Sequence, residues 1–574
     1  MKQLAHCRKA YTDDQDKALH PEETVRLIKK RFGRHGETIL QDSKRIDTGR
    51  LGIPVFLSVC GSQAREIMPT RKQMGKGASP AQAEASALME LAERYSLFSF
   101  LEPANGFQEL TWSQAEACFG QDLLPLETML DSVHDDIDPA QARTMLDLVS
   151  WRFCPATRPG RSRPVHVPVD WFFTLNEFNG SSAGNTFEEA VLQSGCELVE
   201  RHVCALIDRD RPTLPTISVH EVHDPVLQAL LEAFSRQGVH LVLKDFSLNT
   251  GVPTVGAMAY DPSTFPVKSE IVFTAGTATS PVKAAIRALT EVAQLAGDFE
   301  TGSCYDPSGL GKLTSMEECR WLESGPEISL SDLPDISHED FLTEIESLQN
   351  RLADVGTSLY SIDTTHPELH IPACYSFVPG FLFRERTSRA SLGLFIGRIL
   401  TEQCSLAEAE HGLSVLEELQ PKAPYVPFFK GLIQLRSGDL QSARQAFDQA
   451  EAVQPSAEER GLASFYTAYT LSQMGQWQAS LPYLDRAIEL CPDVHAYYNL
   501  RGVARFKLQA YTEAAKDFDR ALSIDAGSAI DLANLGLCYR HLGNRGEAVS
   551  CLETSLELDP SLDFARSALQ ELTG

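Results

Sequence analysis

The sequence predicts two architectures in one chain: an α+β domain over residues 1–395 and an all-α repeat solenoid over residues 424–574, joined by a connecting helix and linker over residues 396–423. Three observations support this prediction. Extended segments alternate with helical segments up to about residue 395. Beyond that point the strand signals vanish and helical periodicity takes over. The helical part then repeats every 34 to 37 residues, as stacked helix pairs do.

Composition narrows the class of protein. The chain has 574 residues, 43% of them hydrophobic and 22% charged, which is typical of a soluble protein with several domains. Its net charge of −27 disfavours a nucleic-acid partner, because non-specific binding to DNA or RNA needs a basic surface. No apolar run reaches the roughly 18 residues of a membrane span, and the N-terminus lacks the apolar segment of a signal peptide. The 13 cysteines are dispersed without a C-x-x-C pair, which favours reduced thiols and a cytoplasmic location.

The elements of the first 395 residues follow from local patterns. Residues 1–20 are polar, and we expect them to lack a fixed structure. Residues 102–165 give no clear pattern, and residues 300–340, rich in Gly, Ser, Asp and Pro, are typical of a long loop. The expected helices are 21–34, one from residue 80 onward, 187–207, 225–237, one from residue 281 onward, and 341–355; the expected strands are 53–60, 165–173, 239–244, 254–260, 271–275, 358–362 and 371–377.

Three of these helices share an unusual polar face. The first opens at Ser79 with Gln82 three residues later, and the second at Thr186 with Glu189 three residues later, both capping boxes. Ser280, followed by proline, opens the third. Polar side chains then recur at steps of three and four residues, which places them along one face of each helix. They are Ser86, Glu90, Glu93 and Arg94 on the first helix; Glu189, Gln193, Glu197, Glu200 and Arg201 on the second; and Arg287, Glu291 and Gln294 on the third.

The repeated acidic face indicates a binding site. Glutamates three residues apart repel each other, so such a face is either solvated or holds a positive group. One E-x-x-E-R motif is weak evidence, since most charged helix faces are simply solvated. Here the motif occurs twice, at residues 90–94 and 197–201, and R-x-x-x-E-x-x-Q follows on a third helix. Five converging glutamates need cations, which favours Mg²⁺, an ion that takes oxygen ligands and is often bound together with phosphates.

Two further features would suit phosphate groups. Lys76 lies between two glycines, where a flexible backbone would let its ammonium reach a phosphate. Asn185 and the backbone amides of residues 184–186 could add donors at a helix N-terminus. The chain has no G-x-x-x-x-G-K-[ST] motif, so a P-loop is not the way it would bind ATP.

These motifs, in this order, resemble the YcaO protein family. The resemblance spans roughly residues 15–390 and rests on G-K-G with S-A-x-x-E-x-x-E-R (75–94), S-A-G-N-T with E-x-x-E-R (182–201) and R-x-x-x-E-x-x-Q (287–294). It implies ATP and Mg²⁺ as cofactors. Arg94 and Arg201 could serve as internal counter-ions of the glutamates rather than contact the nucleotide. The matching positions imply metal ligands at Glu90, Glu93, Glu197, Glu200 and Glu291, and nucleotide contacts at Lys76, Ser86, Asn185, Glu189, Gln193, Arg201, Arg287 and Gln294.

The resemblance also implies a reaction, the ATP-dependent activation of a peptide backbone amide. A nucleophile adds to the carbonyl, the oxyanion is phosphorylated, and loss of phosphate leaves a new C–S, C–O or C–N bond. A Cys, Ser or Thr of the peptide gives an azoline, and external sulfide gives a thioamide. The chain ends in Q-E-L-T-G, without the Pro-x-Pro-x-Pro tail common in azoline-forming members, and shows no ThiF-like domain. These departures leave room for a separate TfuA-like or ThiF-like partner, or for an accessory role in methylthiolation of a ribosomal protein.

Residues 424–574 carry the repeats. Gly431, Ala468, Gly502 and Gly536 lie 37, 34 and 34 residues apart, with a small residue twelve positions after each and Phe or Leu sixteen positions after each. The pattern resembles about four tetratricopeptide repeats, starting near residues 424, 461, 495 and 529 and closed by a capping helix over 561–572. We expect them to bind a substrate peptide or a partner protein. The alternatives are that they only dimerise the chain or pack on the first domain, or that the chain is a scaffold with a degenerate nucleotide domain.

Overall fold

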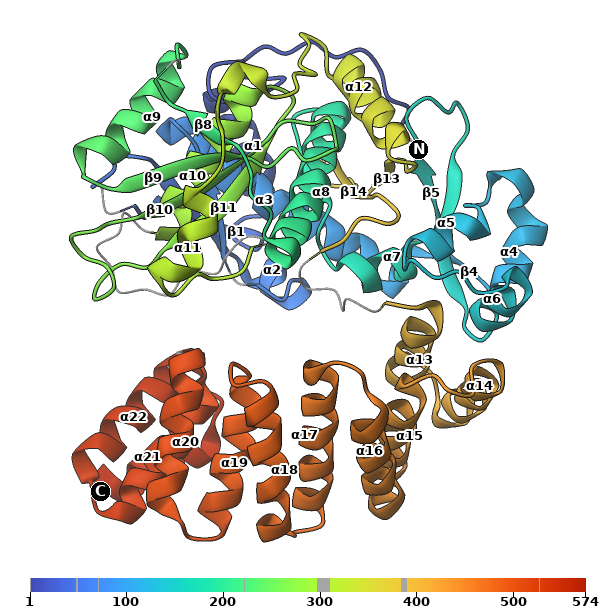
Figure 1. Ribbon diagram of the computed structural model, residues 1–574, viewed down its shortest axis with the longest axis vertical. Helices are drawn as coiled ribbons and strands as arrows, with labels where there is room; N and C mark the ends of the chain where they lie inside the picture. The colour runs from blue at the N-terminus through green and yellow to red at the C-terminus, as the bar shows by residue number, and fades with distance from the viewer. Residues whose placement is uncertain are drawn as a thin grey trace. The chain divides into compact units, whose positions relative to one another are not determined.

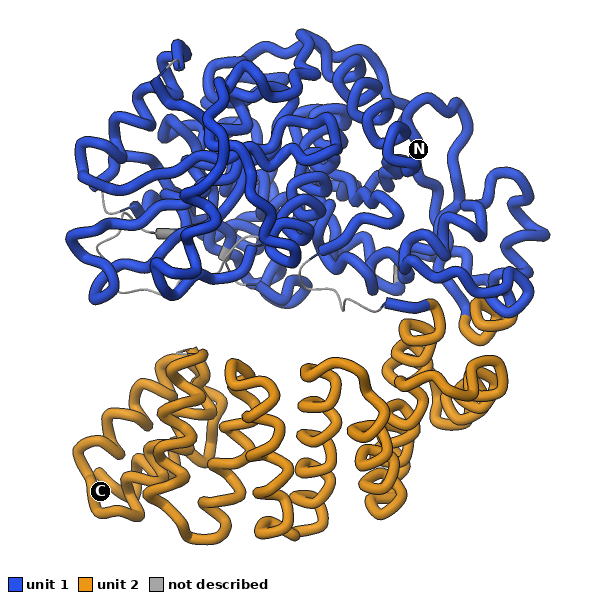
Figure 2. Tube along the Cα trace, in the orientation of Figure 1, with its two compact units in different colours: residues 1–143, 150–391 blue, residues 144–149, 392–574 orange. Residues whose placement is uncertain are grey.

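The computed structural model describes residues 2–47, 50–70, 72–220, 222–296, 310–383, 390–525 and 527–573. The chain divides into two compact units (Figure 2). Unit 1 comprises residues 1–143 and 150–391, and unit 2 comprises residues 144–149 and 392–574. No helix within the described ranges is long and apolar enough to cross a bilayer.

The described residues of unit 1 form three sheets that are antiparallel apart from one parallel pair, β8 and β12. The first sheet has the order β1-β2-β3 and the second has the order β11-β10-β9-β8-β12. The third has the order β4-β5-β13-β14-β7, with β6 paired to β5. The strands are β1 (Leu40–Arg45), β2 (Val55–Cys60), β3 (Lys72–Lys76), β4 (Gln108–Leu110), β5 (Trp151–Thr157), β6 (Val165–Pro168), β7 (Ser181–Ala183), β8 (Thr216–Ser218), β9 (His240–Asp245), β10 (Thr254–Tyr260), β11 (Val272–Thr277), β12 (Glu327–Ser329), β13 (Tyr360–Asp363) and β14 (Ala373–Phe377).

The three acidic helices are α3 (Pro80–Leu101), α8 (Phe187–Asp210) and α10 (Pro281–Ala296), and each packs on a different sheet (Figure 1). Helix α3 packs mainly on the first sheet, α10 on the second and α8 on the third, and each also contacts another sheet. Each helix contributes its apolar side to a separate hydrophobic core. The predicted α+β class is therefore confirmed, and the polar faces are left to meet one another. The other helices are α1 (Pro21–Gly33), α2 (Ser62–Ile67), α4 (Trp112–Phe119), α5 (Leu126–Asp131), α6 (Pro139–Leu146), α7 (Val169–Asn176), α9 (Pro225–Arg236), α11 (Met316–Glu323) and α12 (Phe341–Asp354).

Local sequence fixes where the acidic helices begin. Ser79 caps α3 by accepting a hydrogen bond from the backbone N–H of Gln82 at 3.2 Å. Thr186 caps α8 in the same way, accepting from the N–H of Glu189 at 3.2 Å. Each helix follows a strand, as predicted: β3 precedes α3, β7 precedes α8 and β11 precedes α10.

Glycine lets two of these strands lie directly on the helices that follow them. A Cβ on Gly75 would collide with the backbone of Ala83 and Ala87 in α3. A Cβ on Gly276 would collide with the backbone of Ala284 and Ala288 in α10. The two strand–helix units are built alike, since both place a glycine against helix backbone at an i, i+4 pair of alanines.

Three expectations for unit 1 are wrong. The segment before α1, expected to lack fixed structure, forms specific hydrogen bonds with α8 and with the loops before α3 and α12. Only residues 165–168 of the predicted strand 165–173 are extended, because α7 starts at Val169. The predicted loop over 300–340 lies partly outside the described residues, but the rest includes α11 and β12. A capping box of Ser315 and Glu318 opens α11.

Unit 2 is entirely helical in its described part from Leu392 onward. Gly431, Gly502 and Gly536 each face a large side chain of the next helix, which are Phe447, Phe518 and Leu552. Small residues therefore lie where the helices of a pair touch, as the repeat pattern predicts. Of residues 396–423, expected as a connecting helix and linker, 396–403 lie in α13 and 406–419 in α14, and 420–423 connect α14 to α15. The helices are α13 (Leu392–Gln403), α14 (Leu406–Leu419), α15 (Tyr425–Ser437), α16 (Leu440–Val453), α17 (Ala457–Gln473), α18 (Trp477–Leu490), α19 (His495–Lys507), α20 (Tyr511–Ile524), α21 (Ala529–Leu542), α22 (Arg545–Leu558) and α23 (Asp563–Thr573).

Candidate functional site

One cavity of unit 1 gathers the polar faces of α3, α8 and α10. Its volume is about 870 Å³, within the range of small-molecule sites. The end of β3 and residues of the N-terminal segment complete its wall. All the residues that the sequence analysis assigned to metal or nucleotide line this cavity: Lys76, Ser86, Glu90, Glu93, Asn185, Glu189, Gln193, Glu197, Glu200, Arg201, Arg287, Glu291 and Gln294.

Arg94 lies among the carboxylates of α3. Its Nε is 3.3 Å from Glu93 Oε1, and its Nη2 is 3.9 Å from Glu90 Oε1. The guanidinium also lies 4.1 Å from the centroid of the Phe178 ring. Glu93 accepts a further hydrogen bond of 2.5 Å from Ser181 Oγ. This geometry favours the counter-ion role for Arg94.

The site residues of α8 connect it to β11 and α10. Glu200 Oε2 accepts the backbone N–H of Thr277, at the end of β11, at 2.8 Å. Gln193 Oε1 accepts a hydrogen bond of 2.9 Å from Arg287 Nη1 on α10. On α8 itself Arg201 Nε is 3.8 Å from Glu197 Oε1. These contacts fix the second and third acidic faces relative to each other, a long-range arrangement that the spacing along one helix does not reveal.

Lys76 joins the first sheet to the third acidic helix. It ends β3, and its ammonium pairs with the carboxylate of Glu291 on α10. Burial and the nearby Arg287 guanidinium lower the pKa of Lys76 to about 7. A phosphate placed beside Lys76 would favour its protonated form, because an anion offsets both effects.

The charges around the cavity do not balance. Its lining includes seven glutamates against two lysines and three arginines, a formal excess of two negative charges. Burial, followed by repulsion from Glu197 and Glu90, raises the pKa of Glu93 against the opposing effect of Arg94. Burial also raises the pKa of Glu90 and of Glu197. The carboxylates are therefore held in a place that disfavours their charge, and a cation would relieve this cost.

The donors fit Mg²⁺ shared with phosphates better than a metal enclosed by protein. Within the described ranges, no three Asp, Glu, His or Cys side chains lie close enough together to hold a metal ion by themselves. Mg²⁺ seldom needs such a cage, because it commonly binds one or two carboxylates, several waters and phosphate oxygens. An oxygen-only set spread over three helices fits that mode.

Sequence reasoning missed the contribution of the N-terminal segment. Gln15 and Lys17, which precede α1, and Thr24 of α1 line the cavity. Thr24 Oγ1 donates a hydrogen bond of 2.9 Å to Asn185 Oδ1. Glu189 accepts from the backbone N–H of Ala18 at 2.9 Å, and Lys17 Nζ lies 3.7 Å from Glu189 Oε1. The start of the family resemblance near residue 15 was the available signal, and the polar composition obscured it.

The fold and the cavity define a class of protein: an α+β domain in which three acidic helix faces surround a polar cavity, followed by a helical-repeat domain. Residues 74–382, more than half of the chain, match the family model described as YcaO cyclodehydratase, ATP- and Mg²⁺-binding. The chain therefore belongs to the YcaO family, and ATP and Mg²⁺ are the cofactors of that family. Residues 465–529 and 529–562 match tetratricopeptide repeat models, which confirms tetratricopeptide repeats over that part of the chain.

Individual relatives cover different parts of the chain. A Rhizobium leguminosarum bv. trifolii protein, named as an uncharacterised protein in the tfuA 3′ region, is 26% identical over 391 residues, which cover 64% of this chain and 89% of that protein. The Escherichia coli K12 ribosomal protein S12 methylthiotransferase accessory factor YcaO is 29% identical over 207 residues, which cover 33% of this chain and 35% of that protein. The structure of a heterocyclase in complex with substrate and cofactor has a similar fold, with a TM-score of 0.52 and 20% identity over 67% of this chain and 54% of that one.

Proposed function

We propose that this chain is an ATP- and Mg²⁺-dependent enzyme that phosphorylates a backbone amide of a peptide or protein, so that the amide can be converted to an azoline or a thioamide. The observation that carries the proposal is the convergence of three acidic helix faces, with their basic residues, on one cavity of about 870 Å³. A cavity lined by carboxylates without basic residues would suit a metal ion alone. Carboxylates interleaved with Lys76 and Arg287 suit a metal together with phosphates.

The proposed roles follow the positions that match the motifs of the family. The carboxylates proposed as metal ligands are Glu90, Glu93, Glu197, Glu200 and Glu291. Mg²⁺ at these residues would neutralise phosphate charge and act as a Lewis acid. The groups proposed to contact ATP are Lys76, Ser86, Asn185, Glu189, Gln193, Arg201, Arg287 and Gln294. The basic members of this set are paired with carboxylates or amides, so their side chains are held in place by the protein itself.

The chemistry asks little covalent work of the protein. In the proposed step the nucleophile forms a bond to the amide carbon, and the resulting oxyanion takes a phosphoryl group from ATP. Phosphate then departs with the former amide oxygen. Lys76 and Arg287 would stabilise the charge that develops on the transferred group, as basic residues do in other phosphoryl transfers.

The relatives favour a separate partner protein. The Rhizobium relative is named for its place beside tfuA, which supports a TfuA-like partner. The repeats of unit 2 would then hold the substrate or this partner, because stacked helix pairs present extended surfaces suited to peptides. A second candidate, favoured by the Escherichia coli relative, is an accessory factor that binds nucleotide and acts through protein contacts.

The test is calorimetric titration of the intact chain with ATP, with and without Mg²⁺, beside Glu197→Gln and the control Glu232→Gln. Glu232 is an exposed residue of α9 outside the cavity lining. We expect Mg²⁺-dependent binding that Glu197→Gln abolishes and Glu232→Gln leaves unchanged. If the intact chain does not bind ATP, the proposed enzymatic function is refuted, and the remaining hypothesis is a scaffold that acts through its repeats. Binding without ATP turnover in the presence of substrate and partner would favour the accessory factor.

A further inference from the structure

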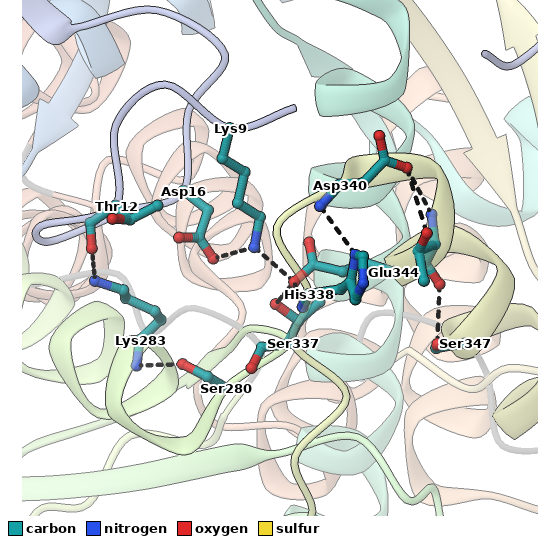
Figure 3. Close-up of polar contacts among 12 residues, drawn as sticks. Lys9, Thr12, Asp16, Ser280, Lys283, Ser337, His338, Asp340, Glu344 and Ser347 are labelled. Atoms are coloured by element: carbon teal, nitrogen blue, oxygen red, sulfur yellow. Dashed lines mark hydrogen bonds and ion pairs between the residues drawn. The ribbon is translucent and has the colours of Figure 1, made fainter. Parts of the chain in front are cut away.

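An ion-paired cluster lies behind the cavity wall rather than in it. Lys9 Nζ is 2.6 Å from Glu344 Oε1 and 2.9 Å from Asp16 Oδ2 (Figure 3). The Lys9 side chain is 4% exposed and that of Glu344 is not exposed at all. Neither Lys9 nor Glu344 lines the cavity. Removing such a pair of charges from water costs free energy. Its presence in a segment that otherwise has the composition of a loop therefore suggests a role beyond stability.

Glu344 connects the cluster to two loops that border the acidic helices. Its Oε1 accepts hydrogen bonds from Thr279 Oγ1 at 2.7 Å and from the backbone N–H of His338 at 2.9 Å. Thr279 lies between β11 and α10. Residue 344 itself lies in the first turn of α12, which packs on α8. The cluster thus contacts the supports of the second and third acidic helices.

Other residues of the N-terminal segment form hydrogen bonds with α8, with α10 and with the chain just before α3. Asp14 Oδ2 accepts the backbone N–H of Ala78, just before α3, at 3.0 Å. The backbone N–H of Ala5 donates to Glu188 Oε1 in the first turn of α8 at 2.9 Å. Lys283 Nζ of α10 donates to the backbone carbonyls of residues 12 and 13 (Figure 3).

The order of residues in the segment explains why the cluster matters to the cavity. Asp16 lies between Gln15 and Lys17, and both of these neighbours line the cavity. The Asp16 carboxylate instead contacts Lys9. A chain held at Asp16 therefore presents the residues on either side of it to the cavity.

We propose that Lys9, Asp16 and Glu344 form a positioning cluster that holds residues 4–18 so that Gln15 and Lys17 form part of the wall of the nucleotide cavity, and that the cluster so sets nucleotide affinity from outside the cavity. The inference rests on the proposed binding of Mg-ATP. These are positioning residues and not catalytic ones, since Lys9 and Glu344 lie outside the cavity lining. When the cluster is broken, the wall is in place in fewer molecules, and the apparent affinity falls by that fraction.

The experiment compares Lys9→Met and the milder Asp16→Asn with Lys312→Met in the full chain. Lys312 forms a 2.7 Å ion pair with Glu270 in the same unit, and neither residue lines the cavity. The first readout is amide hydrogen exchange. The backbone N–H groups of Ala10 and Tyr11 are bonded to the carbonyl of Lys17, so we expect faster exchange over residues 9–18 in both cluster variants and no change there in Lys312→Met.

The second readout is the dissociation constant of Mg-ATP by calorimetry. Lys9→Met should weaken binding about tenfold, as expected if the wall is in place in only about a tenth of the molecules. A purely structural role would lower the melting temperature and leave the affinity of the folded protein unchanged, which would overturn the proposal. Unchanged exchange over residues 9–18 would overturn it as well. If the intact chain binds no nucleotide, the proposed function fails, and the exchange result alone decides whether the cluster positions the wall.

Discussion

The two units use buried charge in opposite ways. In unit 2 the Asp517 side chain is 3% exposed and has two basic partners, Arg501 and Arg505, each at 2.7 Å. Burial alone would lower the pKa of Arg501, but pairing with Asp517 and Asp485 raises it. The Arg501 guanidinium is therefore stabilised in its charged form by its acidic partners.

The cavity of unit 1 has buried charges that remain incompletely compensated. Burial with repulsion from neighbouring carboxylates raises the pKa of Glu93, and burial with a neighbouring guanidinium lowers the pKa of Lys76. Both shifts disfavour the charged forms. The comparison teaches that buried charge alone does not mark a binding site. What distinguishes the cavity of unit 1 is that its ion pairs do not offset the cost of burial, so the pKa of Glu93 stays raised and that of Lys76 stays lowered.

The largest expected effect is the loss of stability when a glycine is replaced by alanine, and we expect this loss to differ between the two units. Gly75→Ala would drive a Cβ into the backbone of α3, and we expect a loss of about 3 kcal/mol or more in the free energy of unfolding. Gly536→Ala would approach Leu552 Cγ at 2.9 Å, where a side chain can move. We expect a loss of about 1 kcal/mol there. Amide exchange of α3 and of α21 measures each cost within the full chain.

The repeats themselves contain the control for this comparison. Ala468 occupies the position equivalent to Gly536, and Leu484 occupies that of Leu552. A natural alanine is thus accommodated beside a leucine in unit 2. If Gly75→Ala cost no more than Gly536→Ala, the close approach of β3 to α3 would not be a constraint on the cavity.

Local signals predicted the parts of the fold that local sequence controls. Capping residues and steps of three and four located α3 and α8 with their polar faces, and a fixed period located the repeats. Such signals act within one turn or one repeat, so they can be recognised without tertiary structure. The overlooked capping box at Ser315 was equally readable, and it opens α11 inside a segment expected to be a loop.

The rest depended on contacts between distant residues. Lys9 and Glu344 are 335 positions apart, so the polar N-terminal segment could not be distinguished from a loose tail. Alternating residues over 165–173 suggested one strand, yet the chain turns into α7 at Val169, where Trp171 and Phe172 are buried. In both cases tertiary packing overrode the local pattern. The assignment of individual side chains to metal or nucleotide stays a prediction.

A second prediction tests the charge comparison directly. Asp517→Asn leaves two arginines without their buried partner, and we expect a loss of about 3 kcal/mol in the free energy of unfolding of unit 2. Glu197→Gln removes a carboxylate that is already disfavoured by burial, so in the absence of Mg²⁺ it should leave the stability of unit 1 unchanged or raise it. Urea unfolding followed by amide exchange in each unit measures both. A large loss of stability in metal-free Glu197→Gln would mean that the cavity charges are compensated after all.

The smallest effect concerns two helix caps that should cost the same in stability and differ in binding. Thr186 caps α8 and Ser456 caps α17, accepting the N–H of Glu189 at 3.2 Å and of Glu459 at 3.1 Å. Replacing either residue by alanine should cost about 1 kcal/mol, the usual value of a cap.

Of these two caps, that of α8 adjoins the cavity and that of α17 does not. Thr186 fixes the turn in which the carboxylate of Glu189 accepts hydrogen bonds from Asn185 Nδ2 at 3.1 Å and from the N–H of Ala18 at 2.9 Å. Thr186→Ala should therefore weaken Mg-ATP binding, whereas Ser456→Ala should leave it unchanged, because its cap serves only the repeat helix. Melting curves would give the stability cost, and calorimetry would give the affinity. Equal affinities in the two variants would show that the start of α8 contributes to folding and not to the arrangement of the site.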